Sequence, residues 1–156
     1  MGTTLPWMMT KSSDPHVIVE RFPGGLKLDL LGLNPVPASR PRVTRWGTHY
    51  SKTYKTWRAS AYEAIPTSDA PPLDGPLKAH VRSVVQKPKT SKLLSPRGDA
   101  DNYGKAILDA ITGHRSDPKG YWNDDSQIWR LISDKVFAKP GETPGHYVTV
   151  WKEDPS

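Results

Sequence analysis

The sequence predicts an α+β fold in which a mixed β-sheet packs against two main helices. Short runs of alternating apolar residues, typical of strands, are interspersed with two longer segments of helical character. Proline-rich stretches separate these segments and read as loops, in line with the 16 prolines in the chain. A length of 156 residues is sufficient for one domain with its own core.

The strands are expected in two groups. Residues 17–22 and 26–30 alternate on either side of Pro23-Gly24-Gly25, which predicts an N-terminal hairpin preceded by a polar leader. Later in the chain, strands are expected at residues 77–86, 128–138 and 146–151. Because these strands and the helices alternate irregularly, the pattern favours one mixed sheet.

Two helices are expected, at residues 53–65 and at about 101–112. Pro66 ends the first helix and Gly113 ends the second. The second is the clearer, because its apolar residues share the spacing of one buried stripe: Tyr103, Ala106, Ile107, Ala110 and Ile111. Segments 34–42, 66–76 and 87–98 are expected to be loops, the last of them rich in Lys.

The chain is basic, with a net charge of +6, and its charges are uneven. No acidic residue occurs between Asp29 and Glu63 or between Asp74 and Asp99, and 12 of the 22 Lys and Arg lie there. Aromatic residues interleave the first stretch, which favours nucleic acid over a merely solvated face. The candidate DNA-binding residues are Arg40, Arg42, Arg45, Lys52, Lys87, Lys89, Lys92 and Arg97.

The composition also excludes several kinds of functional site. The absence of Cys excludes a disulfide scaffold, a thiolate zinc site and a cysteine nucleophile. The five His are scattered without a metal-binding pair, and no Gly-rich phosphate loop is present, which argues against a small-molecule phosphohydrolase. No apolar stretch is long enough to span a bilayer, so a cytoplasmic protein without membrane contact is expected.

Four aspartates stand out around the second helix: Asp99, Asp101, Asp124 and Asp125. Carboxylates that lie close together repel one another unless a cation sits between them, and a divalent metal is the usual solution. Structural roles compete with this reading. Asp101 is placed for an N-cap, and Asp124-Asp125 follows an aromatic pair in good turn chemistry.

The polar face of the second helix adds a cation to this group. Asp101 and Lys105 lie within about 40° of each other on a helical wheel. Asp109 continues the same face, where a surface ion pair is the favoured interpretation for it. For Lys105 the sequence favours a surface ion pair and a functional role equally.

The segment Asp99-Ala100-Asp101-Asn102-Tyr103-Gly104-Lys105, continuing to Asp109-Ala110-Ile111, resembles the signature of the RusA family of Holliday junction resolvases. The segment Asp124-Asp125-Ser126-Gln127-Ile128 is similar to the second family motif. The resemblance covers roughly residues 26–151. It departs from the family in the leader and in a longer 113–120 loop. It divides the chain into a leader and hairpin extension (1–25), a nuclease domain (26–152) and a tail (153–156).

The resemblance implies a homodimer that binds four-way DNA junctions and makes paired symmetric nicks with Mg²⁺, or with Mn²⁺ in its place. Asp99, Asp101 and Asp125 would be the essential carboxylates and metal ligands, Asp124 would assist them, and Lys105 would be the catalytic lysine. One or two ions fit this ligand count. Ends with 5′-phosphate and 3′-hydroxyl groups are predicted.

Two other functions remain open at this point. One is a broader nuclease for flaps, forks and other branches, serving phage DNA processing with the same chemistry. The other is a non-catalytic junction-binding protein whose acidic residues are only caps and turns. The second alternative leaves the spacing of Asp99 and Asp101 without an explanation.

Overall fold

The computed structural model of the chain describes residues 14–39, 42–45, 47–49 and 51–156. Its centre is a five-stranded mixed sheet in the order β1-β2-β9-β5-β8. The strands are β1 (His16–Phe22), β2 (Gly25–Leu31), β5 (Leu77–Val85), β8 (Ile128–Phe137) and β9 (Gly145–Lys152). Only β5 and β8 pair in parallel, and the other neighbours are antiparallel.

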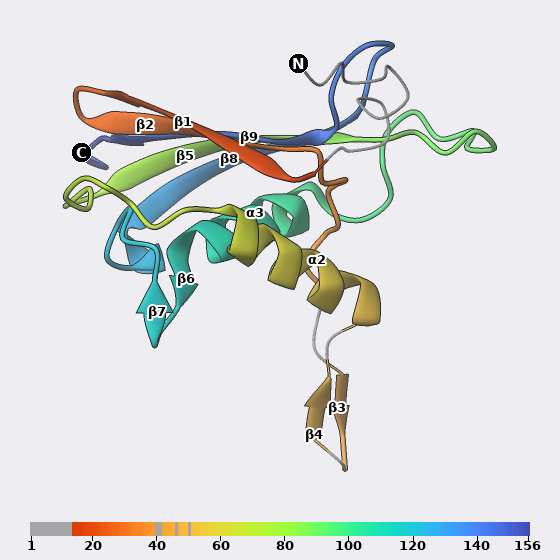
Figure 1. Cartoon of the computed structure of the whole chain (residues 1–156), viewed down its shortest axis with the longest axis horizontal. Coiled ribbons are helices and arrows are strands. Elements are labelled where there is room, and N and C mark those ends of the chain that lie inside the picture. Colours follow the sequence, from red (N-terminus) through yellow and green to blue (C-terminus); the bar gives the residue numbers. More distant parts are fainter. Residues whose placement is uncertain (1–13, 40–41, 46, 50) are drawn as a thin grey trace, which may run out of the picture.

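The two helices are α2 (Lys52–Ala64) and α3 (Ala100–Thr112), and both lie on the same side of the sheet (Figure 1). The fold class predicted from the sequence, an α+β domain with a mixed sheet and two main helices, is therefore confirmed. β1 and β2 pair along their whole length, and β2 pairs with β9, so the hairpin is part of this sheet. The proposed division of the chain at residue 25 stays a prediction.

The core lies between the helices and the sheet. The strands β2 and β9 point alternate residues into it, among them Leu28, Leu30 and Val148, all fully buried. The side of α3 that faces away from its acidic residues supplies the matching apolar surface, including Ile107 and Ile111. This packing fixes the rotation of α3 and therefore the direction of its polar face.

Gly104 lets α3 approach β8 closely. A Cβ at this position would lie 2.7 Å from Ser133 Oγ and 3.2 Å from Leu131 Cδ2, so a larger residue would push the helix away. The Ser133 hydroxyl also donates to the Ala100 carbonyl at 2.5 Å, which ties β8 to the first turn of α3. The site-bearing helix is thus held directly against an edge strand of the sheet.

Five short elements complete the described chain. β3 (Arg42–Thr44) and β4 (Gly47–His49) form a two-stranded ribbon beyond the helices (Figure 1). β6 (Gly113–His114) pairs with β7 (Asp117–Pro118), and the 3₁₀ turn η1 (Asp125–Gln127) leads into β8. The described helices include none that is both long enough and apolar enough to cross a bilayer.

Candidate active site

One side of α3 and the turn before β8 enclose a cavity of about 340 Å³. Asp101, Lys105 and Asp109 reach it from successive turns of α3, and Asp125 reaches it from η1. Apolar side chains form the remaining lining: Leu108, Ile128 and Leu131. The structure therefore brings together three of the residues predicted to be catalytic, Asp101, Lys105 and Asp125, in what we call the carboxylate cavity.

The start of α3 differs from the expectation by one or two residues. The helix begins at Ala100 and its N-cap position is Asp99, whose side chain makes no capping hydrogen bond. Asp101 lies inside the first turn, so the alternative interpretation of Asp101 as the N-cap is wrong. Because the chain is extended at Asp99 (φ −80°, ψ 140°), this residue takes the N-cap position and the helix starts one residue earlier than expected. Asp99 is exposed at the helix start and is not part of the cavity lining.

The segment before Asp99 is held in place by side chains from α3 and β8. The Lys135 ammonium donates to the carbonyls of Pro96 and Gly98, at 2.7 and 2.5 Å. The Tyr103 hydroxyl donates to the Arg97 carbonyl at 2.6 Å. These bonds satisfy a loop backbone that has no secondary structure of its own, and they set the direction from which Asp99 enters α3.

Asp125 is positioned from two sides. The Thr112 hydroxyl, in the last turn of α3, lies 2.6 Å from Asp125 Oδ1 and can donate to it. On the other side, the Gln127 carboxamide donates to the carbonyls of Leu73 and Gly75, at 2.9 and 3.0 Å. The turn η1 is thereby fixed to the segment before β5, and Asp125 faces α3.

Asp124 has a structural role in the same turn. Its Oδ1 accepts from the Ser126 N–H at 3.1 Å, and Gln127 Oε1 accepts from the Asp124 N–H at 2.9 Å. This reciprocal arrangement is a capping box around η1. Asp124 is exposed and, like Asp99, does not line the carboxylate cavity, so its role as an assisting metal ligand stays a prediction.

Asp109 also belongs to the carboxylate cavity. The sequence predicts a surface ion pair for this residue, but its side chain is half-buried in the cavity lining. Burial and then the negative charge of Asp125 raise the pKa of Asp109 to about 6, against smaller opposing effects of Lys105 and Arg58. Its place on the same helical face as Asp101 was visible in the sequence, whereas the burial arises from β8 and η1.

The donor set suits a hard divalent cation. Carboxylate oxygens are the ligands that Mg²⁺ prefers, and the charge of Asp125 adds to the larger effect of burial that raises the pKa of Asp109. Across residues 14–39, 42–45, 47–49 and 51–156, however, no three His, Asp or Glu side chains converge tightly enough to hold a metal ion.

The candidate DNA-binding residues are distributed over three places. Arg40 lies outside the described residues, Arg42 lies in β3, and Arg45 is exposed in the turn that follows β3. Lys52 begins α2 and lines a surface cavity of about 430 Å³ beside Asn34. The others belong to the segment of residues 87–98, the basic loop, where all four are exposed: Lys87, Lys89, Lys92 and Arg97.

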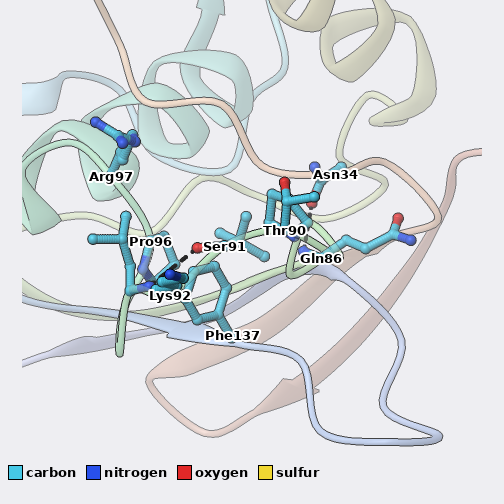
Figure 2. A pocket seen from close by; sticks show the side chains of 11 residues that line it. Asn34, Gln86, Thr90, Ser91, Lys92, Pro96, Arg97 and Phe137 are labelled. Carbon is cyan, nitrogen blue, oxygen red and sulfur yellow. Dashed lines mark hydrogen bonds between the residues drawn. The ribbon is translucent and has the colours of Figure 1, made fainter.

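The basic loop forms a further cavity of about 610 Å³, together with the ends of β5 and β8 (Figure 2). Lys92 and Arg97 line it, as does Asn34, which also borders the cavity of Lys52. Asn34 therefore connects the cavity of Lys52, at the start of α2, to the cavity of Lys92 and Arg97, and Arg97 precedes Asp99 by two residues. This arrangement can place a polyanion alongside the carboxylate cavity.

Comparison with known protein families gives a match over most of the chain. The family model described as endodeoxyribonuclease RusA matches residues 32–150, which include both helices, the carboxylate cavity and the basic loop. No curated protein sequence matches the chain.

Proposed function

The chain belongs to the RusA family of endodeoxyribonucleases, and from this premise we propose that it is a Mg²⁺-dependent nuclease that resolves four-way DNA junctions. Family membership makes it an endodeoxyribonuclease, and the family acts on Holliday junctions. Dependence on Mg²⁺, the pairing of the nicks and a role in recombination and repair are our proposals. The observation that carries them is the carboxylate cavity at the end of a track of basic side chains.

We assign the metal to Asp101 and Asp125, with Asp99 from the helix start and Asp109 from the third turn completing the ligands available. When bound, Mg²⁺ would supply the positive charge that activates water and polarises the phosphate, and Mn²⁺ would substitute for it. Asp109 extends the set predicted from the sequence. Asp124 is better explained as the residue that shapes η1, through its bond to Ser126.

Lys105 is the positively charged side chain that the protein itself contributes to the carboxylate cavity. It follows Asp101 by one helical turn and lines the same cavity, with its side chain exposed to an incoming strand. An ammonium group at this position can stabilise the negative charge that builds on the phosphate oxygens or on the leaving 3′ oxygen. Cleavage of this bond leaves a 5′-phosphate and a 3′-hydroxyl end.

Paired nicks require two identical sites, so we propose a homodimer. The described part of β8 offers support for this, because it is an edge strand with two large apolar side chains exposed outside the carboxylate cavity, Trp129 and Ile132. An uncovered edge of this kind tends to pair with another chain. The dimer is tested by light scattering, which should give twice the monomer mass, while a monomeric mass at micromolar concentration would contradict it.

The catalytic assignment is tested with Asp101→Asn, which keeps the shape of the side chain and removes its charge. We expect nicking of a synthetic four-way junction to fall by at least about a thousandfold while junction binding is retained. The matched control is Asp69→Asn, an exposed aspartate in the 66–76 loop, which should cut normally. Cleavage by Asp101→Asn at the natural rate would overturn the assignment.

A further inference from the structure

The cavity of about 610 Å³ under the basic loop is separate from the carboxylate cavity, and the two have no lining residue in common. It lies where β5 and β8 end, between these strands and the basic loop (Figure 2). Its size is within the range of about 300–1,000 Å³ that small-ligand sites occupy. Nothing in the catalytic assignment requires this cavity.

The lining combines three kinds of chemistry. Phe137 provides an aromatic ring, with Pro88 and Pro96 beside it and the Lys87 ammonium 5.7 Å from the ring centre, so a base would stack on the face that Lys87 leaves open. Asn34, Gln86, Thr90 and Ser91 provide hydrogen-bonding groups, and Lys92 and Arg97 provide positive charge. Figure 2 shows Arg97 set apart from the other labelled side chains, nearer to α3. A nucleotide needs all three: a ring to stack on, polar groups for its base edge, and cations for its phosphate.

The cavity is built on anchored backbone. The Asn34 carboxamide oxygen accepts from the Gln86 N–H at 2.8 Å, and the Ser91 N–H donates to the Pro88 carbonyl at 3.0 Å. The Lys135 bonds to Pro96 and Gly98 hold the other end of the basic loop. These bonds fix the backbone at both ends of the basic loop, which lowers the cost of ordering the loop when a ligand binds.

The position of the cavity relates it to the cut. Leu131 lines the carboxylate cavity and Phe137 lines this one, six residues further along the same strand. At about 3.3 Å per residue this is roughly 20 Å. That distance corresponds to about six stacked nucleotides at 3.4 Å each, and to fewer in an extended strand. A strand bound at Asp101 can therefore reach this cavity with a nucleotide several positions from the scissile phosphate.

We propose that this cavity, here called the base pocket, holds one unstacked nucleotide of the DNA substrate and so gives the nuclease a base preference near the cut. Phe137 stacks on the base, Gln86 and Thr90 contact its edge, and Lys92 and Arg97 bind the adjoining phosphates. The proposal rests on the proposed function for its substrate, but its test measures binding and does not depend on cleavage.

The test uses fluorescently labelled four-way junctions in which successive positions of one strand are made abasic, with binding measured in EDTA. The natural protein should lose about tenfold in affinity when the base at one particular position is missing, because stacking on an aromatic ring is lost there. Phe137→Leu should bind the complete junction about tenfold more weakly and be insensitive to the abasic position. Phe22→Leu is the matched control, since Phe22 is the other phenylalanine of the chain and lies exposed on β1.

An abasic scan without any sensitive position would overturn the base pocket, as would Phe137→Leu behaving like Phe22→Leu. Should Phe137→Leu fail to fold, Gln86→Ala replaces it, because Gln86 is exposed and its change should alter which base is preferred at that position. Cleavage without a sensitive position would leave the proposed nuclease standing and remove the pocket. A sensitive position without cleavage would support the base pocket and overturn the proposed nuclease activity. Absence of DNA binding would overturn the base pocket and the nuclease activity together.

Discussion

The hydroxyl of Thr112 lies 2.6 Å from Oδ1 of Asp125, so the last turn of α3 holds a carboxylate that a different element contributes. The same hydroxyl lies 2.9 Å from the Leu108 carbonyl, the usual acceptor for a Thr within a helix. Asp125 therefore has its orientation set by α3, the helix that also carries Asp101, Lys105 and Asp109.

Thr112→Val should lower the rate of junction nicking by about tenfold or more. The change keeps the shape of the side chain and removes the hydrogen bond to Asp125, and bonds to charged groups contribute about 1.5–3 kcal/mol. Thr112→Ser retains the hydroxyl and should restore most of the rate. Equal rates for Thr112→Val and Thr112→Ser would show that this bond does not position Asp125.

Asp109 should make the fold less stable as the pH rises from 4 to 6. Its folded-state pKa, about 6, is above its ordinary value of 3.8, so the folded protein keeps a proton that the unfolded chain releases. Asp109→Asn removes this penalty. The gain in unfolding free energy should be near zero at pH 4 and level off at about 1–2 kcal/mol at pH 7, once the partial exposure of the group is taken into account.

Urea denaturation of Asp109→Asn and the natural protein, in EDTA at several pH values, measures this difference. Asp154→Asn is a suitable comparison, because Asp154 is exposed in the segment after β9. A gain that does not vary with pH would mean that Asp109 carries no raised pKa in solution.

His146 should have the opposite effect on stability in acid. It is fully buried, with Nδ1 at 2.8 Å from Ser83 Oγ and its ring against Trp57, and burial lowers its pKa to about 3. The unfolded chain takes up a proton near pH 6.5 that the folded protein excludes. The stabilisation is therefore complete above pH 6.5 and decreases as the pH falls towards 3, by about 2 kcal/mol at pH 5.

Replacing the pair with His146→Leu and Ser83→Ala together should flatten this acid dependence without leaving a buried hydroxyl unpaired. Denaturation curves at pH 7 and pH 5 give the comparison. If the double variant loses as much stability between these pH values as the natural protein, another group controls the acid sensitivity.

Arg97→Gln should reduce the salt dependence of junction binding. Each phosphate contact that is lost lowers the slope of log affinity against log salt by about 1. Lys27→Gln is the control, because Lys27 lies on β2 between two buried leucines and points to the sheet face away from the helices. Fluorescence anisotropy from 50 to 300 mM salt measures the slopes. A slope unchanged by Arg97→Gln but reduced by Lys27→Gln would place DNA on the opposite face.

The larger elements of the fold were predictable because their signals are local. The stripe from Tyr103 to Ile111 and the alternation in β2 and β9 each determine a buried face by themselves. The short pairs β3–β4 and β6–β7 were not predicted, since two or three residues carry no periodicity. The strand order was also out of reach, because it depends on contacts between distant segments.

The site was only partly predictable for the same reason. Asp101 and Lys105 are one helical turn apart in the sequence, so their shared direction follows from helix geometry. The inclusion of Asp109 depends on η1 and β8, which reach α3 only in the folded chain. Likewise, the capping box around Asp124 requires the hydrogen bonds of Gln127 to be known, and a sequence pattern alone does not distinguish this role from metal binding.

We propose metal-dependent cleavage of branched DNA as the activity of this protein. Incubating the natural protein with a synthetic four-way junction, a flap and a linear duplex of the same sequence tests this activity. With Mg²⁺ or Mn²⁺, denaturing gels should show nicks in opposing strands of the junction, with 5′-phosphate ends, and little cutting of the linear duplex. In EDTA these products should be absent. Efficient cleavage of flaps with weak cleavage of junctions would identify the broader branched-DNA nuclease, and junction binding without any metal-dependent product would contradict the account.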